Sequence, residues 1–288
     1  MAQKFHSAAE QCLGIRPSGN SVTQSPSRLC ASVALLWFCG VAGCVRSNYN
    51  LATQQEEYTI TSTEKEVEVG RKIARRVEAE LSVAADEPLQ QRVRSIGERI
   101  AAVCDRRELV YRFTVVHDDD VNAFSLPGGY VFINDGLIKK ISSDDELAGV
   151  IAHEVAHIAA RHAVKRYESQ LGLQIAQLAA LAARQGTAAG GLSVAAQAAQ
   201  LAYARQDELE ADRLGVKYMK AAGFDPKAML AFLQKLHDLD RDKSHYIPRG
   251  VVRPQYALTH PYVPERLRAV KEALFGVADY IDYLNTPN

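Results

Sequence analysis

Two histidines and a glutamate lie close together in the segment from residue 150 to residue 164, which reads VIAHEVAHIAARHAV. The segment is rich in alanine and contains no glycine or proline, so it is predicted to be one helix. Residues four apart share a helix face, so His153 and His157 can direct their rings to one point, as a tetrahedral zinc site requires. Glu154 lies beside them, where it can act as a general base on water that a metal activates.

A third ligand would distinguish a zinc site from a chance HExxH pattern. The arrangement HExxHxxGxxH needs glycine at position 160 and histidine at position 163, where this chain has Ala160 and Ala163. His162 comes one residue early, and on a continuing helix it points away from the face of the two candidate ligands. We therefore expect His162 to be exposed or to cap the helix rather than to bind metal.

A better candidate for the third ligand lies downstream, in the run RQDELEADRLG from residue 205 to residue 215. Glu208 and Asp212 are four apart and share a helix face. Glu208 would complete a His-His-Glu zinc set, and Asp212 could accept the free ring N–H of a ligand histidine and fix its tautomer. Glu210 points to the other side and is expected to be solvated. By itself, this run would be interpreted as a charged, exposed helix.

Four motifs in order resemble one known family. The run NAFSLPGGYVFINDG at 122–136 precedes HEVAHIAARH, which is followed by EADRLG and then by LTHP at 258–261 with Arg266. This arrangement resembles the HtpX and CAAX prenyl protease (Ste24-like) family of gluzincin zinc metallopeptidases over roughly residues 60 to 275, and is most similar to its small periplasmic lipoprotein members. Such proteins often have Ser-Arg before the glutamate motif, where this chain has Ala204-Arg205.

The resemblance implies an α+β fold that is mostly helical, with a small sheet beside the HExxH helix. It implies one Zn²⁺ per chain, with three protein ligands: His153, His157 and Glu208. Glu154 would take the proton of the attacking water and pass it to the leaving amine. Asp212 would support the metal ligands from behind.

The same resemblance places His260 and Arg266 near the metal, where both could stabilise an oxyanion during catalysis. His260 could instead occupy the open zinc position and hold the enzyme latent. On the motif alone, His260 could also be an ordinary loop histidine next to Pro261.

Substrate binding is expected at the strand from residue 130 to residue 134. In related proteases this strand is the edge along which an extended peptide lies. Pairing at a sheet edge recognises the backbone of the peptide rather than its side chains. The expected substrate-binding residues are Gly129, Tyr130, Val131 and Phe132. Without the resemblance, a plain structural hairpin would be the preferred interpretation.

Residues 1–43 are predicted to be a signal peptide of the lipoprotein type. Arg28 precedes an apolar run, and the sequence VAGC at 41–44 resembles a bacterial lipobox, in which Cys44 is acylated and becomes the first residue. The uncharged run reaches only the lower limit for a spanning helix, so an uncleaved anchor is the alternative. Position 45 is not aspartate, which in similar lipoproteins favours the outer membrane.

Composition and net charge argue against a nucleic-acid-binding protein and against a protein stabilised by disulfides. The 288 residues have the make-up of an ordinary globular protein, and their net charge is zero, so nucleic acid is not an expected partner. Once residues 1–43 are removed and Cys44 carries lipid, Cys104 is the single cysteine left, so no intramolecular disulfide forms. Stability must then come from the core and from the metal.

The elements that position the candidate residues can be outlined from the pattern. Residues 44–60 are polar and are expected to be the lipidated N-terminus and a tether, residues 61–277 the metallopeptidase domain, and residues 278–288 a tail. The first helix of the domain is expected to begin at Ser62 or Thr63, with Glu66 as a capping-box partner of Thr63. Further elements are expected as helices at 88–104, 207–223, 227–239 and 264–275, strands at 109–117 and 130–134, an N-cap box at 143–146 and a helical hairpin over 171–204.

These observations predict a zinc-dependent endopeptidase of the bacterial cell envelope, facing the periplasm. It would cleave misfolded or unassembled envelope proteins and contact the membrane through its N-terminal lipid. The alternative is a non-catalytic or latent zinc-binding assembly factor or chaperone for outer-membrane proteins. Glu154 argues against that alternative, because a structural zinc site closes all four positions and needs no base. Prenyl-protein processing needs a multi-span chamber, for which the chain lacks hydrophobic segments.

Overall fold

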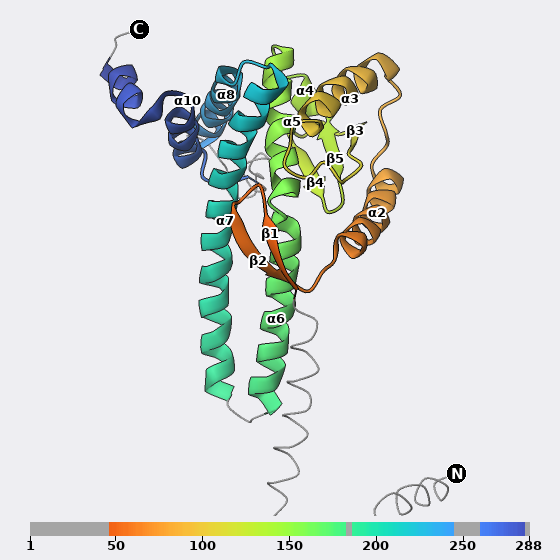
Figure 1. Cartoon of the computed structure of the whole chain (residues 1–288), viewed down its shortest axis with the longest axis vertical. Helices are drawn as coiled ribbons and strands as arrows, with labels where there is room; N and C mark the ends of the chain where they lie inside the picture. Colours follow the sequence, from red (N-terminus) through yellow and green to blue (C-terminus); the bar gives the residue numbers. More distant parts are fainter. Residues whose placement is uncertain (1–45, 183–185, 245–259, 286–288) are drawn as a thin grey trace, which may run out of the picture. The chain divides into compact units, whose positions relative to one another are not determined.

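The computed structural model describes residues 46–182, 186–244 and 260–285, which are mostly helical (Figure 1). The expected α+β fold is therefore confirmed, whereas the expected signal peptide and Cys44 lie outside the described residues. The elements in chain order are β1 (Arg46–Asn50), β2 (Gln55–Thr59), α2 (Thr63–Glu80), α3 (Glu87–Ala101), β3 (Arg112–Val116), β4 (Ala123–Leu126), β5 (Tyr130–Asn134), α4 (Asp135–Ile138), α5 (Asp144–Ala159), α6 (His162–Ala182), α7 (Gly186–Ala222), α8 (Lys227–Ser244) and α10 (Val263–Asn285).

A three-stranded sheet with the order β3-β5-β4 lies beside α5. The expectation that β5 is an edge strand is wrong, because β5 pairs with β3 in parallel and with β4 antiparallel. The chain reverses between β4 and β5 through Gly128 and Gly129, whose φ angles of 78° and 99° are left-handed and favour glycine. All five residues of β5 are buried, and β4 takes the edge position that the sequence assigned to β5.

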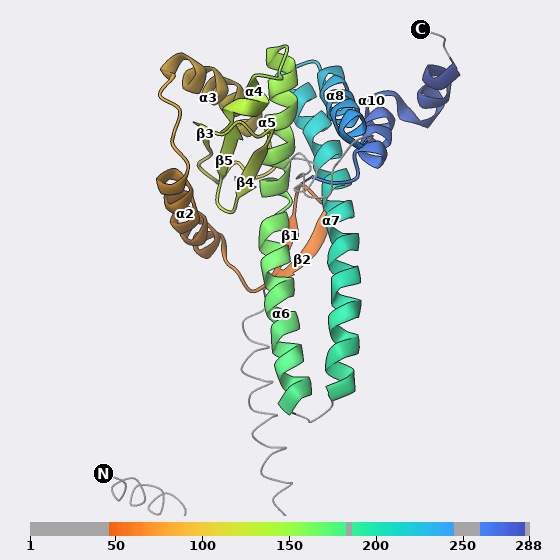
Figure 2. The same ribbon diagram turned by 180° about the vertical axis from the view of Figure 1, so that it is seen from behind.

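The two faces of this sheet are covered by different helices (Figure 2). Alternate strand residues point to opposite faces. The face that packs in the main core with α3 and α5 consists of Phe113, Val115, Val131 and Ile133. The opposite face, which packs with α2, consists of Val116, Tyr130 and Phe132. The sheet therefore fixes α5 in place from one side.

Helix α5 begins where the sequence predicts but ends earlier than predicted. Ser143 is its N-cap and accepts a hydrogen bond from the backbone N–H of Glu146, as expected. The helix does not continue through residue 164, because Arg161 has a left-handed φ of 59° and α6 starts at His162. Arg161 is held there by hydrogen bonds from Nη2 to the carbonyl oxygen of Thr61 and from Nε to Glu66.

Glu66 of α2 is the centre of a buried ion cluster rather than the capping partner that the sequence suggested. Its carboxylate accepts hydrogen bonds from Nη1 of Arg106 at 2.9 Å and from Nε of Arg161 at 3.1 Å. It also accepts one from the backbone N–H of Gly128. The cap of α2 is Ser62, whose side chain accepts from the backbone N–H of Lys65. Glu66 therefore joins α2, the β4–β5 turn and the α5–α6 junction.

Helices α6 and α7 run side by side in opposite directions and extend beyond the sheet (Figure 1). The helical hairpin expected over 171–204 is present in the described parts, and α7 continues without a break into the glutamate motif. It ends at Ala222, before Gly223 with a φ of 76°, as expected. Gly215 of α7 leaves room for the Met229 side chain of α8, because a Cβ at this position would lie 2.7 Å from Cε of Met229.

Residues 46–59, expected to be part of a tether, form the antiparallel hairpin of β1 and β2. The side-chain amide of Asn50 donates to the carbonyl oxygen of Ala159 at 3.3 Å, and the hydroxyl of Thr59 donates to Glu168 at 2.7 Å. These contacts attach the hairpin to the α5–α6 junction. At the other end of the chain, α10 is kinked at Gly276, whose φ is 73°, and then reaches Asn285, so the expected tail is helical over most of its length.

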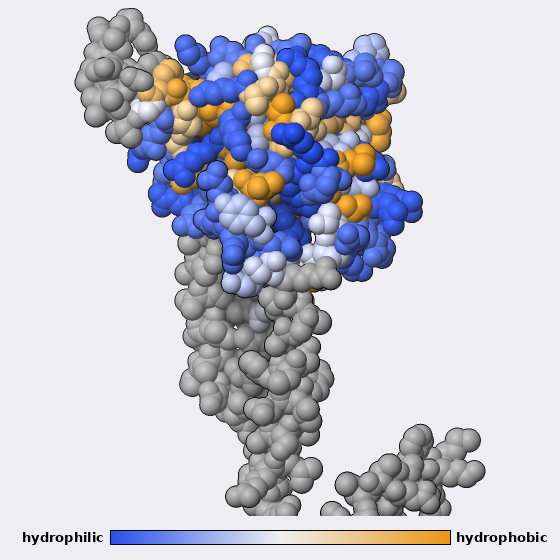
Figure 3. Space-filling view, in the orientation of Figure 1, coloured by the Kyte–Doolittle hydropathy of each residue, from blue (hydrophilic) through white to orange (hydrophobic). Residues whose placement is uncertain are grey.

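The face of the molecule in Figure 3 is mainly hydrophilic, with hydrophobic residues in small separate groups. Within the described ranges, none of the helices combines the length and the apolar character needed to cross a membrane.

We predict that Glu66→Gln lowers the free energy of unfolding by about 3–5 kcal/mol, because removing one partner of a buried ion pair leaves an uncompensated charge. Arg106 and Arg161 would both lose their carboxylate. Chemical unfolding followed by circular dichroism measures the change.

Glu68→Gln is the matched control on the same helix. Glu68 is exposed and pairs with Lys65 and Lys72, so its unfolding midpoint should stay close to that of the unmodified protein. An equal loss of stability in both variants would contradict the special role of Glu66.

Candidate metal centre

Four buried side chains from separate parts of the chain converge at one point. Helix α5 supplies His153 and His157, α7 supplies Glu208, and His260 lies shortly before α10. Each offers one ligand atom, and these atoms all lie within 4.8 Å of one another. The spacing of four residues along α5 brings the two histidine rings to a centroid distance of 4.6 Å.

The separations between these atoms fit a tetrahedral zinc ion. Nε2 of His153 lies 3.0 Å from Nε2 of His157 and 3.3 Å from Nδ1 of His260. The carboxylate oxygens of Glu208 lie 3.3 Å from Nε2 of His153 and 3.4 Å from Nε2 of His157. Zinc–ligand bonds of about 2.0–2.1 Å place tetrahedral ligand atoms about 3.3–3.4 Å apart. Imidazole and carboxylate are also ligand types that zinc prefers.

Asp212 lies behind His153, one helical turn after Glu208. Its Oδ1 atom is 2.9 Å from Nδ1 of His153, the contact that a carboxylate needs to fix the tautomer of a ligand histidine. Arg266 donates to both oxygens of Asp212 at 2.8 Å, and its Nη1 atom lies 3.3 Å from Oε2 of Glu208. Arg266 is buried, and its guanidinium contacts the carboxylates of both Asp212 and Glu208.

Burial and the neighbouring charges favour metal-binding protonation states at His157 and Glu208, respectively. Burial raises the pKa of Glu208, but the neighbouring histidines and Arg266 outweigh it and hold this pKa well below its ordinary value. Burial holds the pKa of His157 well below its ordinary value. Burial and Arg266 also lower the pKa of His153, but Asp212 and Glu208 outweigh them and raise it to about 9. A metal must therefore displace a proton from His153.

Glu154 carries a buried carboxylate with no hydrogen-bond partner for either oxygen in the part of the chain that the structure describes. Its Oε1 atom lies 3.3 Å from Nε2 of His260, at ion-pair distance but without hydrogen-bond geometry. A buried carboxylate without hydrogen bonds is costly, so this residue indicates a ligand that completes the site. A water molecule activated by a metal at the four-residue cluster would meet this need.

The structure corrects the sequence interpretation of His162 and Glu210. His162 is fully buried, not exposed, because the break at Arg161 turns it toward α5. Its Nδ1 atom lies 2.8 Å from Nδ1 of His157. Its Nε2 atom lies 3.1 Å from Oε2 of Glu210, which is therefore paired rather than freely solvated. Glu66, far away in the sequence, contributes to the break, so local patterns gave no signal of it.

Strand β4 is the element beside the centre that the sequence did not reveal. The carbonyl oxygen of Ala123 lies 3.3 Å from Nε2 of His260. A small cavity of about 20 Å³ reaches from Ser125 and Leu126 at the end of β4 to His157. Tyr130, Val131 and Phe132, the residues expected to bind substrate, lie instead in the central strand.

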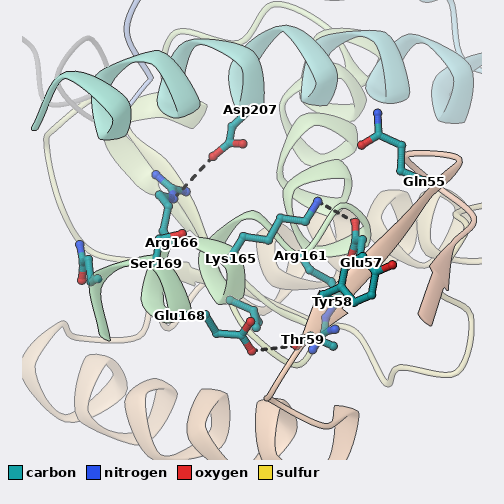
Figure 4. Close-up of a pocket in the computed structure, with 12 residues that line it drawn as sticks. Gln55, Glu57, Tyr58, Thr59, Arg161, Lys165, Arg166, Glu168, Ser169 and Asp207 are labelled. Atoms are coloured by element: carbon teal, nitrogen blue, oxygen red, sulfur yellow. Dashed lines mark hydrogen bonds and ion pairs between the residues drawn. The ribbon is translucent and has the colours of Figure 1, made fainter. Parts of the chain in front are cut away.

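A larger hollow of about 550 Å³ lies between β2, the first turns of α6 and Asp207 (Figure 4). An ion pair between Lys165 and Glu57 and a hydrogen bond between Thr59 and Glu168 connect two of its walls. None of the four residues of the metal cluster lines it, so this hollow is separate from the centre.

Comparisons with known proteins agree with the motif pattern. A family model described as peptidase family M48 matches residues 87–274. The beta-barrel assembly-enhancing protease of Yersinia pestis is 32% identical over 216 residues, which are 72% of this chain and 43% of that protein. The protein of the same name from Escherichia coli is 30% identical over 218 residues, 70% of this chain and 42% of that protein. The mitochondrial metalloendopeptidase OMA1 of Schizosaccharomyces pombe is 30% identical over 190 residues, 63% and 52% of the two chains.

The chain thus spans less than half of the length of these bacterial relatives.

We predict a graded loss of zinc affinity when the cluster is altered. Glu208→Ala should weaken zinc binding most, because it removes a donor atom. Asp212→Ala should weaken it by about 10- to 100-fold, the effect typical of a partner that orients a ligand. Titration of the metal-free protein with zinc against a chromogenic chelator measures both.

Asp207→Asn is the control, because Asp207 is adjacent to Glu208 but lies near His162 and Arg166 rather than at the cluster. If the Asp207 variant lost as much affinity as the Glu208 variant, the proposed donor set would be wrong.

Proposed function

The chain belongs to peptidase family M48, a family of zinc metallopeptidases, and from this membership and the geometry of the centre we propose that it is a zinc-dependent endopeptidase. The family resemblance inferred from the motifs is thereby confirmed. The proposed assignment of His153, His157 and Glu208 as zinc ligands is supported by the closeness of their ligand atoms, which lie within 4.8 Å of one another. The observation that carries the catalytic proposal is the buried carboxylate of Glu154 beside them, which has no hydrogen-bond partner among the described residues.

The proposed reaction is hydrolysis of a peptide bond. When bound, zinc lowers the pKa of a water molecule and polarises the carbonyl group of the substrate. Glu154 accepts the water proton, since neither of its oxygens has a hydrogen-bond partner among the described residues, and returns the proton to the leaving amine. Asp212 holds the His153 ring through Nδ1, and Arg266 holds Asp212. We therefore propose a positioning role for Arg266 in place of the oxyanion role suggested by the motifs.

We propose that an extended substrate pairs with β4 rather than with β5. Strand β4 bonds to β5 along one side, and no described strand pairs with its other side. Its first residue, Ala123, is next to His260 at the centre. A peptide added along this edge would be read mainly through its backbone, which permits many sequences.

We further propose that the substrates are misfolded or unassembled proteins of the bacterial envelope and that Cys44 carries a lipid anchor. The names of the bacterial relatives, which refer to beta-barrel assembly, support this setting, as does the lipobox pattern at 41–44. A latent form is the second candidate. It is favoured by one observation, namely that His260 belongs to the four-residue cluster and could fill the position that water needs.

Glu154→Gln should retain zinc and the fold but lose proteolysis by about 10²- to 10⁴-fold, because the ligands are unchanged and the base is gone. Casein cleavage at measured zinc content tests this. Turnover close to that of the unmodified protein, with one zinc bound, would remove Glu154 from the mechanism.

His260→Ala distinguishes two proposed roles of opposite sign. If His260 fills the open position, its removal frees that position for water, and resting casein cleavage at equal zinc content should rise or at least not fall. If His260 stabilises the oxyanion, activity should fall by about 10²-fold or more, as for a lost donor. We expect the first result; the second would leave only the oxyanion role.

Cys44→Ser should prevent acylation and leave an unprocessed precursor or a mislocalised protein. Mass spectrometry of the N-terminal peptide of the protein purified from cells measures this. A native protein that keeps residues 1–43, or lacks lipid on its first residue, would refute the anchor.

A further inference from the structure

A hydrogen-bonded chain of three side chains leads from the surface of α7 to the metal centre. Oε2 of Glu210 lies 3.1 Å from Nε2 of His162. Nδ1 of His162 in turn lies 2.8 Å from Nδ1 of His157. The opposite ring nitrogen of His157, Nε2, is the atom that faces His153 and Glu208.

The chemistry of this chain permits one arrangement of protons if His157 binds metal. A metal binds the lone pair of Nε2, so the ring proton of His157 must sit on Nδ1. That N–H then donates to Nδ1 of His162, which must be without a proton. His162 therefore carries its proton on Nε2 and donates it to Glu210, which only accepts when ionised.

The surroundings of His162 favour this arrangement. His162 is fully buried, so an unpaired ring nitrogen would be costly. Asp207 is the other nearby acid, but its Oδ1 atom is 3.6 Å from Nε2 of His162, beyond hydrogen-bond distance.

We propose that Glu210 and His162 form a positioning pair that fixes the tautomer and ring orientation of His157. The inference rests on the proposed role of His157 as a metal ligand. The second histidine of the HExxH pattern, His157, then has a positioning partner of its own, separate from the partner of His153. Asp212 orients His153 directly, whereas Glu210 orients His157 through a second imidazole.

The geometry of the chain explains why this pair forms. On an unbroken helix, His162 would point away from the face of His153 and His157. The left-handed Arg161 changes the direction of the backbone between α5 and α6. His162, the first residue of α6, is then placed between the ligand and Glu210 of α7.

The test measures zinc affinity of the metal-free protein by chelator competition. His162→Phe keeps a ring of similar size but removes the acceptor, and should weaken zinc binding by about 10- to 100-fold. Glu210→Ala should weaken it by about tenfold, the lower end of that range. Because the Glu210 side chain is 34% exposed, this second variant is informative even where the first does not fold. Glu210→Gln keeps an accepting oxygen and should restore part of the loss.

A spectroscopic measurement separates positioning from simple packing. Long-range proton–nitrogen correlation of the zinc-loaded, ¹⁵N-histidine-labelled protein reports which ring nitrogen carries the proton. We expect the His162 proton on Nε2 alone. A proton on Nδ1 of His162 would overturn the proposal.

Two controls complete the design. Asp207→Asn, which alters the acid beyond bonding distance, should bind zinc like the unmodified protein, within about threefold. His157→Ala in the same assay tests the premise, because unchanged affinity there would refute the proposed ligand set itself. If His157→Ala weakens binding while the Glu210 and His162 variants bind normally, only the positioning pair is refuted.

Discussion

The rest of this structure depends on the buried ion pairs that the carboxylate of Glu66 forms with Arg106 and Arg161. This carboxylate accepts hydrogen bonds from Arg106 and Arg161, and from the turn that joins β4 to β5. A buried charge must be matched by opposite charge and by hydrogen bonds, which places strict demands on the position of each partner. Satisfying Glu66 therefore fixes where the HExxH helix ends and where the edge strand of the sheet lies.

The effect reaches the metal centre through Arg161. Its left-handed backbone ends α5 after the second histidine of the HExxH pattern and starts α6 in a new direction. Without that break, His162 would continue the helix and could not contact Nδ1 of His157. A structural ion cluster and the candidate catalytic centre are thus built from adjacent residues of one chain segment.

The sequence predicted those features that depend on neighbours along the chain. The spacing of four residues placed His153 and His157 on one face, and the same spacing placed Glu208 and Asp212 together on α7. It could not predict that Glu66 would bond to Arg161, since this contact joins residues 95 positions apart. The order of the strands was missed for a similar reason, because pairing of β5 with β3 is a long-range choice. The errors at His162, Glu210 and the substrate strand all follow from such distant contacts.

The burial of the centre affects the rate at which a bound metal ion is lost. All four residues of the cluster are buried, and Asp212 and Arg266 cover them from behind. An ion held there can leave only when the buried ligand side chains move apart. The rate at which metal is lost then reports how often the fold opens around the ion, while the affinity reports the strength of the bonds. A protein of this kind can hold its metal for a long time without holding it unusually tightly.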